Sequence, residues 1–127
     1  MKIVLTGGGT GGHFYPLIAI AEELNRIADE ERIVNFKLYY LGDSPYDKAL
    51  LEEQFITYVP ITAGKLRVYF SLKNILDIFK TGFGVVQTTL KLFSLYPDVV
   101  ISKGGYASFP VLVAAWILRI PVIIHDS

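Results

Sequence analysis

A cluster of five glycines between Gly7 and Gly12 is the feature that most constrains how this chain can fold. The cluster follows a short apolar run at 3–5 and precedes a segment with helical spacing of apolar residues at 16–27. A strand, a glycine turn and a helix in this order open a parallel α/β fold, whose ligands lie beyond the carboxyl ends of the strands. Glycine N–H groups and a helix amino terminus attract anions. The cluster therefore predicts a site for a phosphate or a diphosphate.

The rest of the chain continues to alternate between strand patterns and helix patterns. Further strands are expected at 36–41, 55–61, 98–102 and 121–125, and further helices at 47–54, 72–95 and 109–118. Glycines at 82 and 84 predict a break in the longest helix, and the apolar composition of 109–118 predicts that this helix is buried. The strands read as continuous apolar runs, as in sheets covered on both faces. We therefore expect an α/β fold with a Rossmann-like parallel sheet and helices on both faces.

Length and composition exclude several other classes of protein. The 127 residues suit one domain, and the absence of cysteine excludes disulfide scaffolds and thiolate metal sites. A net charge of +0 argues against a nucleic-acid binder that depends on a basic surface. The longest apolar run, 109–118, is well short of the roughly 20 residues of a membrane-spanning helix. We expect a soluble protein of a reducing cytosol.

Three interpretations of the first glycine cluster compete. A Walker A loop would need Gly-Lys-Ser/Thr at its end, and His13 follows Gly12 instead. The spacing Gly7-x-Gly9-x-x-Gly12 fits a dinucleotide fingerprint, although Asp43, the only well-placed acidic residue, comes late for it. The third interpretation is a phosphate loop with a functional histidine. A simple tight turn would need fewer glycines.

A second glycine motif, Lys103 to Ser108, follows the strand expected at 98–102. It opens at the same edge of the sheet, so two glycine loops could hold two sides of one phosphorylated ligand. A dinucleotide fold does not require this second loop. Ser108 can also cap the helix that follows it, and both roles can hold together.

Several motifs of the chain resemble the MurG family, the bacterial transferases that add N-acetylglucosamine to lipid I, a lipid-linked cell-wall precursor. The matching motifs are Gly8-Gly9-Thr10-Gly11-Gly12-His13-x-x-Pro16, Tyr96-Pro97-Asp98-Val99-Val100, Gly104-Gly105-Tyr106-x-Ser108-x-Pro110, Ala114-Ala115-Trp116 and Ile120-Pro121-Val122. The resemblance implies a GT-B enzyme with two Rossmann-like domains, of which the first binds the acceptor and the second binds UDP-GlcNAc. Residues 1–127 would then form a single acceptor-binding domain, truncated before the C-terminal domain.

The resemblance also assigns roles to matching positions. The acceptor diphosphate would be bound by Gly8, Gly9, Thr10, Gly11, Gly12, Gly104, Gly105, Tyr106 and Ser108. His13 would be the catalytic base or an acceptor ligand, since an imidazole with a pKa near about 6.5 can take a proton from the C4 hydroxyl of N-acetylmuramic acid. Attack on the donor sugar would invert C1 and form lipid II in peptidoglycan synthesis. No cofactor and no metal are implied. Helix capping or a loop hydrogen bond is the structural alternative for His13.

The last motif departs from the family pattern. The family has His-Glu-x-Asn, whereas this chain has His125 and Asp126 and reaches Ser127 before an asparagine. Asp126 is therefore an acceptor-proximal residue whose role stays open, because its side chain is one methylene shorter. An ordinary core or edge position is the simpler interpretation of His125, which ends an apolar strand.

The zero net charge conceals two unlike halves. Residues 1–60 hold five basic against nine acidic side chains, and residues 61–127 hold seven against three. Basic and apolar residues alternate through the second half, which predicts a patch that binds an anionic membrane. The patch consists of Lys65, Arg67, Phe70, Lys73, Ile75, Leu76, Phe79, Lys80 and Phe83. Burial against a protein partner is the alternative, and the resemblance favours the cytoplasmic side of the bacterial inner membrane.

Two other functions compete with the transferase. One is a nucleotide-binding Rossmann module that uses Gly7, Gly9, Gly12 and Asp43. The other is the acceptor and membrane subunit of a split GT-B transferase, which recruits a separately encoded chain for the donor. In every case the isolated 127 residues are expected to be inactive as a transferase.

Overall fold

The computed structural model describes residues 1–7, 11–42, 45–61, 72–103 and 109–124, with the backbone alone at 11–13, 72–81 and 109. These residues form one five-stranded parallel sheet of order β3-β2-β1-β4-β5. The strands are β1 (Lys2–Thr6), β2 (Lys37–Gly42), β3 (Ile56–Pro60), β4 (Val99–Ser102) and β5 (Val122–Ile124). All four pairings are parallel, which confirms the predicted sheet.

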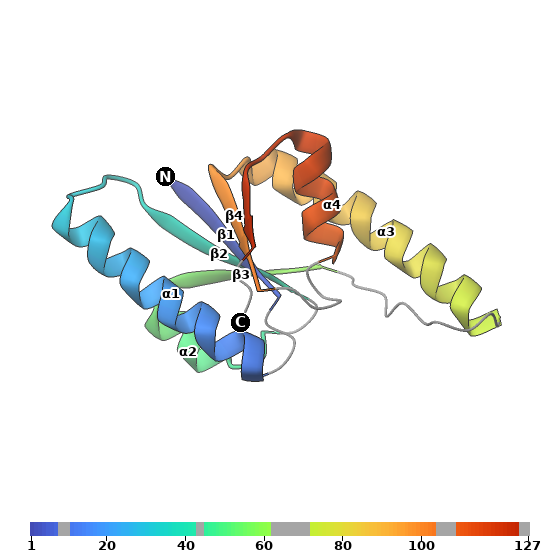
Figure 1. Ribbon diagram of the computed structural model, residues 1–127, viewed down its shortest axis with the longest axis horizontal. Coiled ribbons are helices and arrows are strands. Elements are labelled where there is room, and N and C mark those ends of the chain that lie inside the picture. The colour runs from blue at the N-terminus through green and yellow to red at the C-terminus, as the bar shows by residue number, and fades with distance from the viewer. Residues whose placement is uncertain (8–10, 43–44, 62–71, 104–108, 125–127) are drawn as a thin grey trace.

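Four helices cover the two faces of this sheet (Figure 1). They are α1 (Gly11–Glu30), α2 (Lys48–Glu53), α3 (Leu72–Leu95) and α4 (Phe109–Leu118). On one face, Phe14 and Leu17 of α1 and Leu51 of α2 pack against Leu5 of β1. On the other face, α3 and α4 pack through the buried residues Leu92, Val111, Ala114 and Ala115. The predicted arrangement, with helices on both faces, is confirmed.

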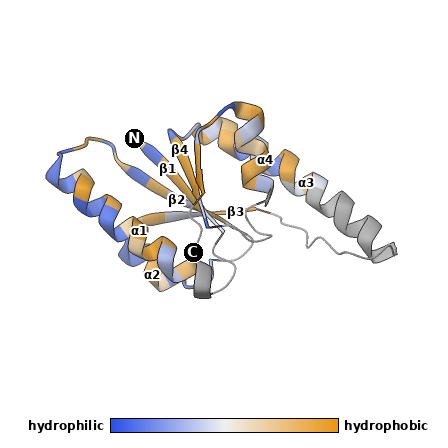
Figure 2. Cartoon of the chain, viewed as in Figure 1, coloured by the Kyte–Doolittle hydropathy of each residue, from blue (hydrophilic) through white to orange (hydrophobic). Residues whose placement is uncertain are grey.

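Alternation along the strands divides the core between the two faces. Ile101 joins the cluster under α1, and its neighbour Val100 joins the cluster under α3 and α4. Because successive side chains of a strand point to opposite faces, this pattern fixes the face of every strand residue. Figure 2 shows hydrophobic colour on the strands and on α4, whereas α1 alternates between hydrophobic and hydrophilic colour.

Helix α1 starts earlier than the sequence predicted. Pro16 was expected near the first turn, but it lies inside the helix, and Gly11, Gly12 and His13 form helical backbone rather than loop. The physical reason is Phe14, which is fully buried in the core and extends the apolar spacing of Leu17 backwards by one turn. Pro16 forgoes a single intrahelical hydrogen bond, and this burial outweighs that loss.

Two expectations about the other layer were wrong. Helix α3 is continuous through Gly82 and Gly84, because a glycine costs a helix only about 1 kcal/mol and the packing of Leu92 outweighs that cost. Helix α4 is buried on one side only, since Trp116 is 79% exposed and Ile117 is exposed as well. The amino-terminal turns of α3 project beyond the sheet (Figure 1).

The amino terminus is tied into the amino edge of the sheet. The α-ammonium group of Met1 donates a hydrogen bond to the carbonyl of Asn35, 3.0 Å away. The backbone N–H of Lys2 donates to Oδ2 of Asp98 at 2.8 Å, and the N–H of Asp98 donates to the carbonyl of Lys2 at 2.8 Å. These bonds fix the start of β1 between β2 and β4.

Candidate functional site

The strand order creates a switch point between β1 and β4, which are neighbours in the sheet but far apart in the chain. The helix that follows β1 packs on one face, and the helix that follows β4 packs on the other. The two connections therefore diverge above the carboxyl ends of these strands, where ligands of open α/β sheets bind. The first glycine motif begins at Gly7, directly after β1, and the second at Lys103, directly after β4.

Hydrogen bonds hold the rim of the switch point in place. The buried hydroxyl of Thr6 donates to the carbonyl of Leu41 at 2.9 Å, which ties the end of β1 to β2. On the other side, the N–H of Lys103 donates to the carbonyl of Thr6 at 3.0 Å. Gly7 then adopts a φ of 98°, a conformation that favours glycine. The strand ends are thus fixed, and the chain turns sharply where the first glycine cluster begins.

The structure describes part of the predicted site. The backbones of Gly11, Gly12 and His13 form the first turn of α1, directly at the switch point. The other residues predicted to bind the diphosphate lie outside the described residues: Gly8, Gly9, Thr10, Gly104, Gly105, Tyr106 and Ser108. Asp43 and Asp126 lie outside them as well. The first turn of α1 contains no acidic side chain. The N–H groups of a first helical turn have no partner within the helix, and together with the helix dipole they favour an anion.

A group of aromatic side chains borders the site beside the start of α1, and the sequence analysis missed it. The ring of Phe14 lies 4.7 Å from that of Tyr46 and 5.8 Å from that of Tyr40, measured between centroids. Tyr15 and Tyr46 are exposed at this edge. Tyr40 also lies over Gly42, where an added Cβ would come within 3.0 Å of its ring. The sequence signal for this group was the density of tyrosines from 39 to 58.

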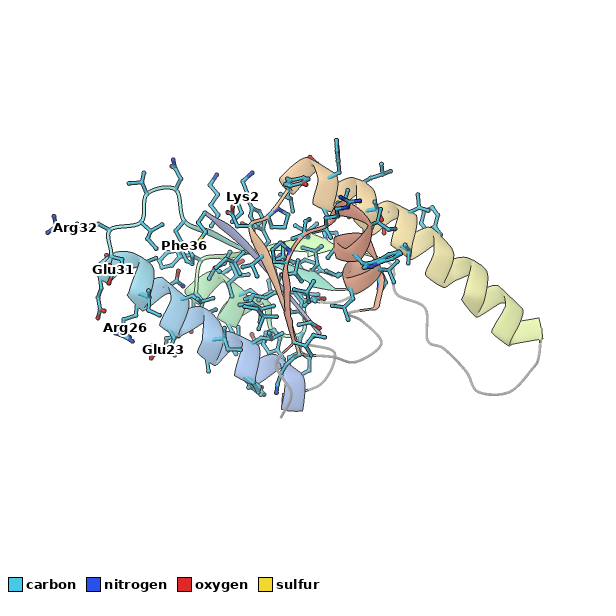
Figure 3. The ribbon with its side chains drawn as sticks, turned by 45° about the horizontal axis from the view of Figure 1, so that its top comes forward. Lys2, Glu23, Arg26, Glu31, Arg32 and Phe36 are labelled. Carbon is cyan, nitrogen blue, oxygen red and sulfur yellow. The ribbon has the colours of Figure 1, made fainter. Side chains whose placement is uncertain are left out.

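Ion pairs lie on the outer surface of α1, away from the switch point. Arg26 of α1 makes ion pairs with Glu23 at 2.6 Å and Glu30 at 2.8 Å. The hydrogen bond to Glu23, followed by that to Glu30, raises the pKa of Arg26 above its ordinary value. Figure 3 shows Glu23 and Arg26 side by side on the outer surface of α1. Within the described ranges, no group of three acidic, histidine or cysteine side chains could hold a metal ion.

The predicted membrane patch is described only in part. Lys65, Arg67 and Phe70 lie outside the described residues, and α3 carries the backbone of Lys73, Ile75, Leu76, Phe79 and Lys80. Phe83 is 63% exposed, and it begins an exposed stripe on α3 with Val86, Leu90 and Phe93, which are spaced for one helix face. Among the described residues, none of the helices is both long and apolar enough to cross a bilayer.

The fold and the divided switch point define the class of the protein: it is an N-terminal domain of a GT-B glycosyltransferase. Residues 3–127 match the glycosyltransferase family 28 N-terminal domain. Because this match spans nearly the whole chain, the chain belongs to glycosyltransferase family 28.

Relatives with curated names are UDP-N-acetylglucosamine–N-acetylmuramyl-(pentapeptide) pyrophosphoryl-undecaprenol N-acetylglucosamine transferases. The protein from Legionella pneumophila (strain Corby) is 44% identical over 99% of this chain, and one from Bacillus cereus (strain ATCC 10987) is 41% identical over the same share. The match covers 33% and 34% of those proteins, so the chain spans about a third of their length.

Solved structures agree with this assignment. The crystal structure of Acinetobacter baumannii MurG superposes with a TM-score of 0.74 at 26% identity, over 98% of this chain and 34% of the other. The glycosyltransferase of kitacinnamycin superposes with a TM-score of 0.67 over 98% of this chain and 30% of its own; at 21% identity it supports the fold alone. The expected resemblance to the MurG family is confirmed.

Proposed function

We propose that this chain is the acceptor-binding domain of an N-acetylglucosaminyltransferase whose acceptor is N-acetylmuramyl-(pentapeptide) pyrophosphoryl-undecaprenol. The observation that carries the proposal is the switch point between β1 and β4, with a glycine motif on each side, in a chain 44% identical to transferases of that name. The acceptor contains a diphosphate, which suits the helix terminus and the glycine motifs.

The proposed reaction is a single displacement. His13, on the first turn of α1, takes the proton of the acceptor's C4 hydroxyl. The freed oxygen forms a bond to C1 of the N-acetylglucosamine unit, the bond from C1 to UDP breaks, and C1 is inverted. UDP-GlcNAc is held mainly by a second domain outside this chain, so UDP leaves from that domain. The isolated chain binds the acceptor and does not turn over the donor.

A binding experiment tests this proposal. The probe is an N-acetylmuramyl-pentapeptide diphosphate that carries a short polyprenyl chain, titrated into the 127-residue chain by calorimetry. The variants Gly9→Ala and Gly105→Ala are expected to weaken binding, because an added methyl group obstructs the approach of the backbone to the diphosphate. Gly82→Ala is the matched control, since a Cβ at this position meets nothing within 4 Å. Absence of binding by the unaltered chain would refute the proposal, and so would transfer of GlcNAc by that chain alone.

The polyprenyl chain of this acceptor also gives the exposed apolar stripe a function. We infer that the chain is peripheral at the cytoplasmic face of the inner membrane, with α3 against the bilayer. Phe83, Leu90 and Phe93 would enter the lipid interface, and lysines along α3 would meet anionic headgroups. Sedimentation with vesicles tests this inference. Binding is expected to phosphatidylglycerol-containing vesicles and to fall with salt, and equal binding to purely zwitterionic vesicles would contradict the electrostatic part.

A further inference from the structure

Tyr15 and Tyr46 form an exposed pair of rings beside the first turn of α1. Their ring centroids lie 5.9 Å apart with the planes at 90°, and the two residues are 53% and 46% exposed. The fully buried Phe14 contacts both rings, with its centroid 5.8 Å from that of Tyr15 and 4.7 Å from that of Tyr46. The core therefore holds the pair in place, and each residue keeps about half of its surface for another contact.

The pair lies at the carboxyl edge of the sheet, beside β2 rather than between β1 and β4. Tyr46 belongs to the connection from β2 to α2, where Asp47 caps α2 by accepting a hydrogen bond from the N–H of Leu50 at 3.2 Å. Tyr15 follows the first turn of α1, and helical side chains lean toward the amino end of their helix. The ring of Tyr15 therefore lies along this turn, at the margin of the position that favours an anion.

The other parts of the proposed acceptor already have a place in the fold. The diphosphate is assigned to the first turn of α1, and the polyprenyl chain to the α3 layer on the opposite face of the sheet (Figure 1). His13 is assigned to the C4 hydroxyl of the muramyl ring, and Tyr15, two residues later, lies on a different side of the helix. Muramic acid carries its peptide on the lactyl group at C3, next to C4. The pentapeptide is thus the part of the acceptor that remains for the rings beside α1.

We propose that Tyr15 and Tyr46 bind the pentapeptide of the acceptor and so distinguish a peptide-bearing acceptor from a peptide-free one; this inference rests on the proposed function. Tyrosine rings offer a large contact area to backbone amides and methyl groups, and their hydroxyls form hydrogen bonds with a peptide. Because neighbouring rings already hold both side chains, binding orders them little further and costs little conformational entropy.

Calorimetric titration of the 127-residue chain with two probes tests this inference. The first probe is the N-acetylmuramyl-pentapeptide diphosphate with a short polyprenyl chain, and the second is the same molecule without its pentapeptide. Tyr15→Ala and Tyr46→Asn are each expected to weaken binding of the first probe about fivefold, the effect of losing one aromatic contact, and to leave binding of the second within about twofold.

A matched control separates the position of the rings from their exposure. Asparagine is the replacement at position 46 because Tyr46 has a φ of 54°, a left-handed conformation that asparagine tolerates. Phe55→Asn is the control, since Phe55 is also exposed, has a φ of 58° and directly precedes β3 at the opposite edge of the sheet. This variant should bind both probes as the unaltered chain does.

The outcomes separate this inference from the function on which it rests. Unchanged affinity of Tyr15→Ala and Tyr46→Asn for the first probe would overturn the role of the two tyrosines and leave the proposed function standing. Equal losses for both probes would also overturn it, because they would indicate a structural role of the rings. Equal affinity of the unaltered chain for the two probes would show that the peptide makes no contact. If the unaltered chain binds neither probe, the proposed function fails, and the assignment of the tyrosines fails with it.

Discussion

The two helical layers have similar inner surfaces and very different outer ones. Beneath α1 and beneath α3, fully buried leucines at 17 and 92 pack against the same sheet. The outer surface of α1 carries ion pairs around Arg26, whereas the outer surface of α3 carries Phe83, Leu90 and Phe93. The α1 layer thus carries paired charges on its outer surface, together with scattered exposed side chains such as Ile27. The α3 layer carries a contiguous exposed apolar stripe, and this stripe is the basis of the proposed contact with the bilayer.

The largest expected effect tests which side of α3 faces the core. Leu92→Ala should lower the free energy of unfolding by about 3 kcal/mol, because it removes a fully buried side chain. Leu90→Ala, two residues away and 67% exposed, should change it by less than about 0.5 kcal/mol. Urea unfolding followed by circular dichroism measures both values. Equal losses would show that the two sides of α3 do not differ as described.

The next effect concerns the exposed side of the same helix. The double variant Phe83→Ser/Phe93→Ser should weaken binding to anionic vesicles by roughly 2 kcal/mol, or about thirtyfold, if each half-exposed ring contributes about 1 kcal/mol in the lipid interface. Phe55→Ser is the control, because Phe55 is 84% exposed but lies in the acidic half, after α2. Vesicle sedimentation measures the partition. If Phe55→Ser weakened vesicle binding as much as Phe83→Ser/Phe93→Ser, the outer surface of α3 would not differ from that of the α1 layer in membrane binding.

A smaller effect concerns the continuity of α3. Gly82→Ala should raise the free energy of unfolding by about 0.5–1 kcal/mol, because alanine is the better helix former and the position is open. The melting temperature should rise accordingly. A decrease would mean that the helix breaks at this glycine, as its sequence had suggested.

The smallest effect is expected at the ion pairs of α1. Arg26→Ala should lower the free energy of unfolding by no more than about 0.5 kcal/mol, since exposed pairs at helical spacing contribute little and are screened by salt. The difference in the free energy of unfolding between Arg26→Ala and the unaltered chain should be nearly the same at low and at high salt. A loss as large as that of Leu92→Ala would show that the charged surface stabilises the domain as strongly as its core.

The sequence predicted those features that depend on local pattern. Apolar runs marked the strands, and Gly7 marked the end of β1 at the carboxyl edge of the sheet, because these signals act within a few residues. The start of α1 was missed because Pro16 suggested a boundary, while the burial of Phe14 depends on distant strands. The break expected at Gly82 failed for the same reason, since packing against α4 outweighs local propensity. No local signal indicates that Lys103 is buried, because its burial depends on the pairing of β4 with β1.

The attachment of the amino terminus bears on how the molecule can be handled. Met1 and the turn near Asn35 lie at the amino edge of the sheet, and the switch point lies at the carboxyl edge. A fluorophore or a surface tether attached in this turn is therefore separated from the switch point by the length of the strands. A five-residue strand such as β1 spans roughly 16 Å. Immobilisation through this end would leave the switch point facing solution, where ligands can be titrated.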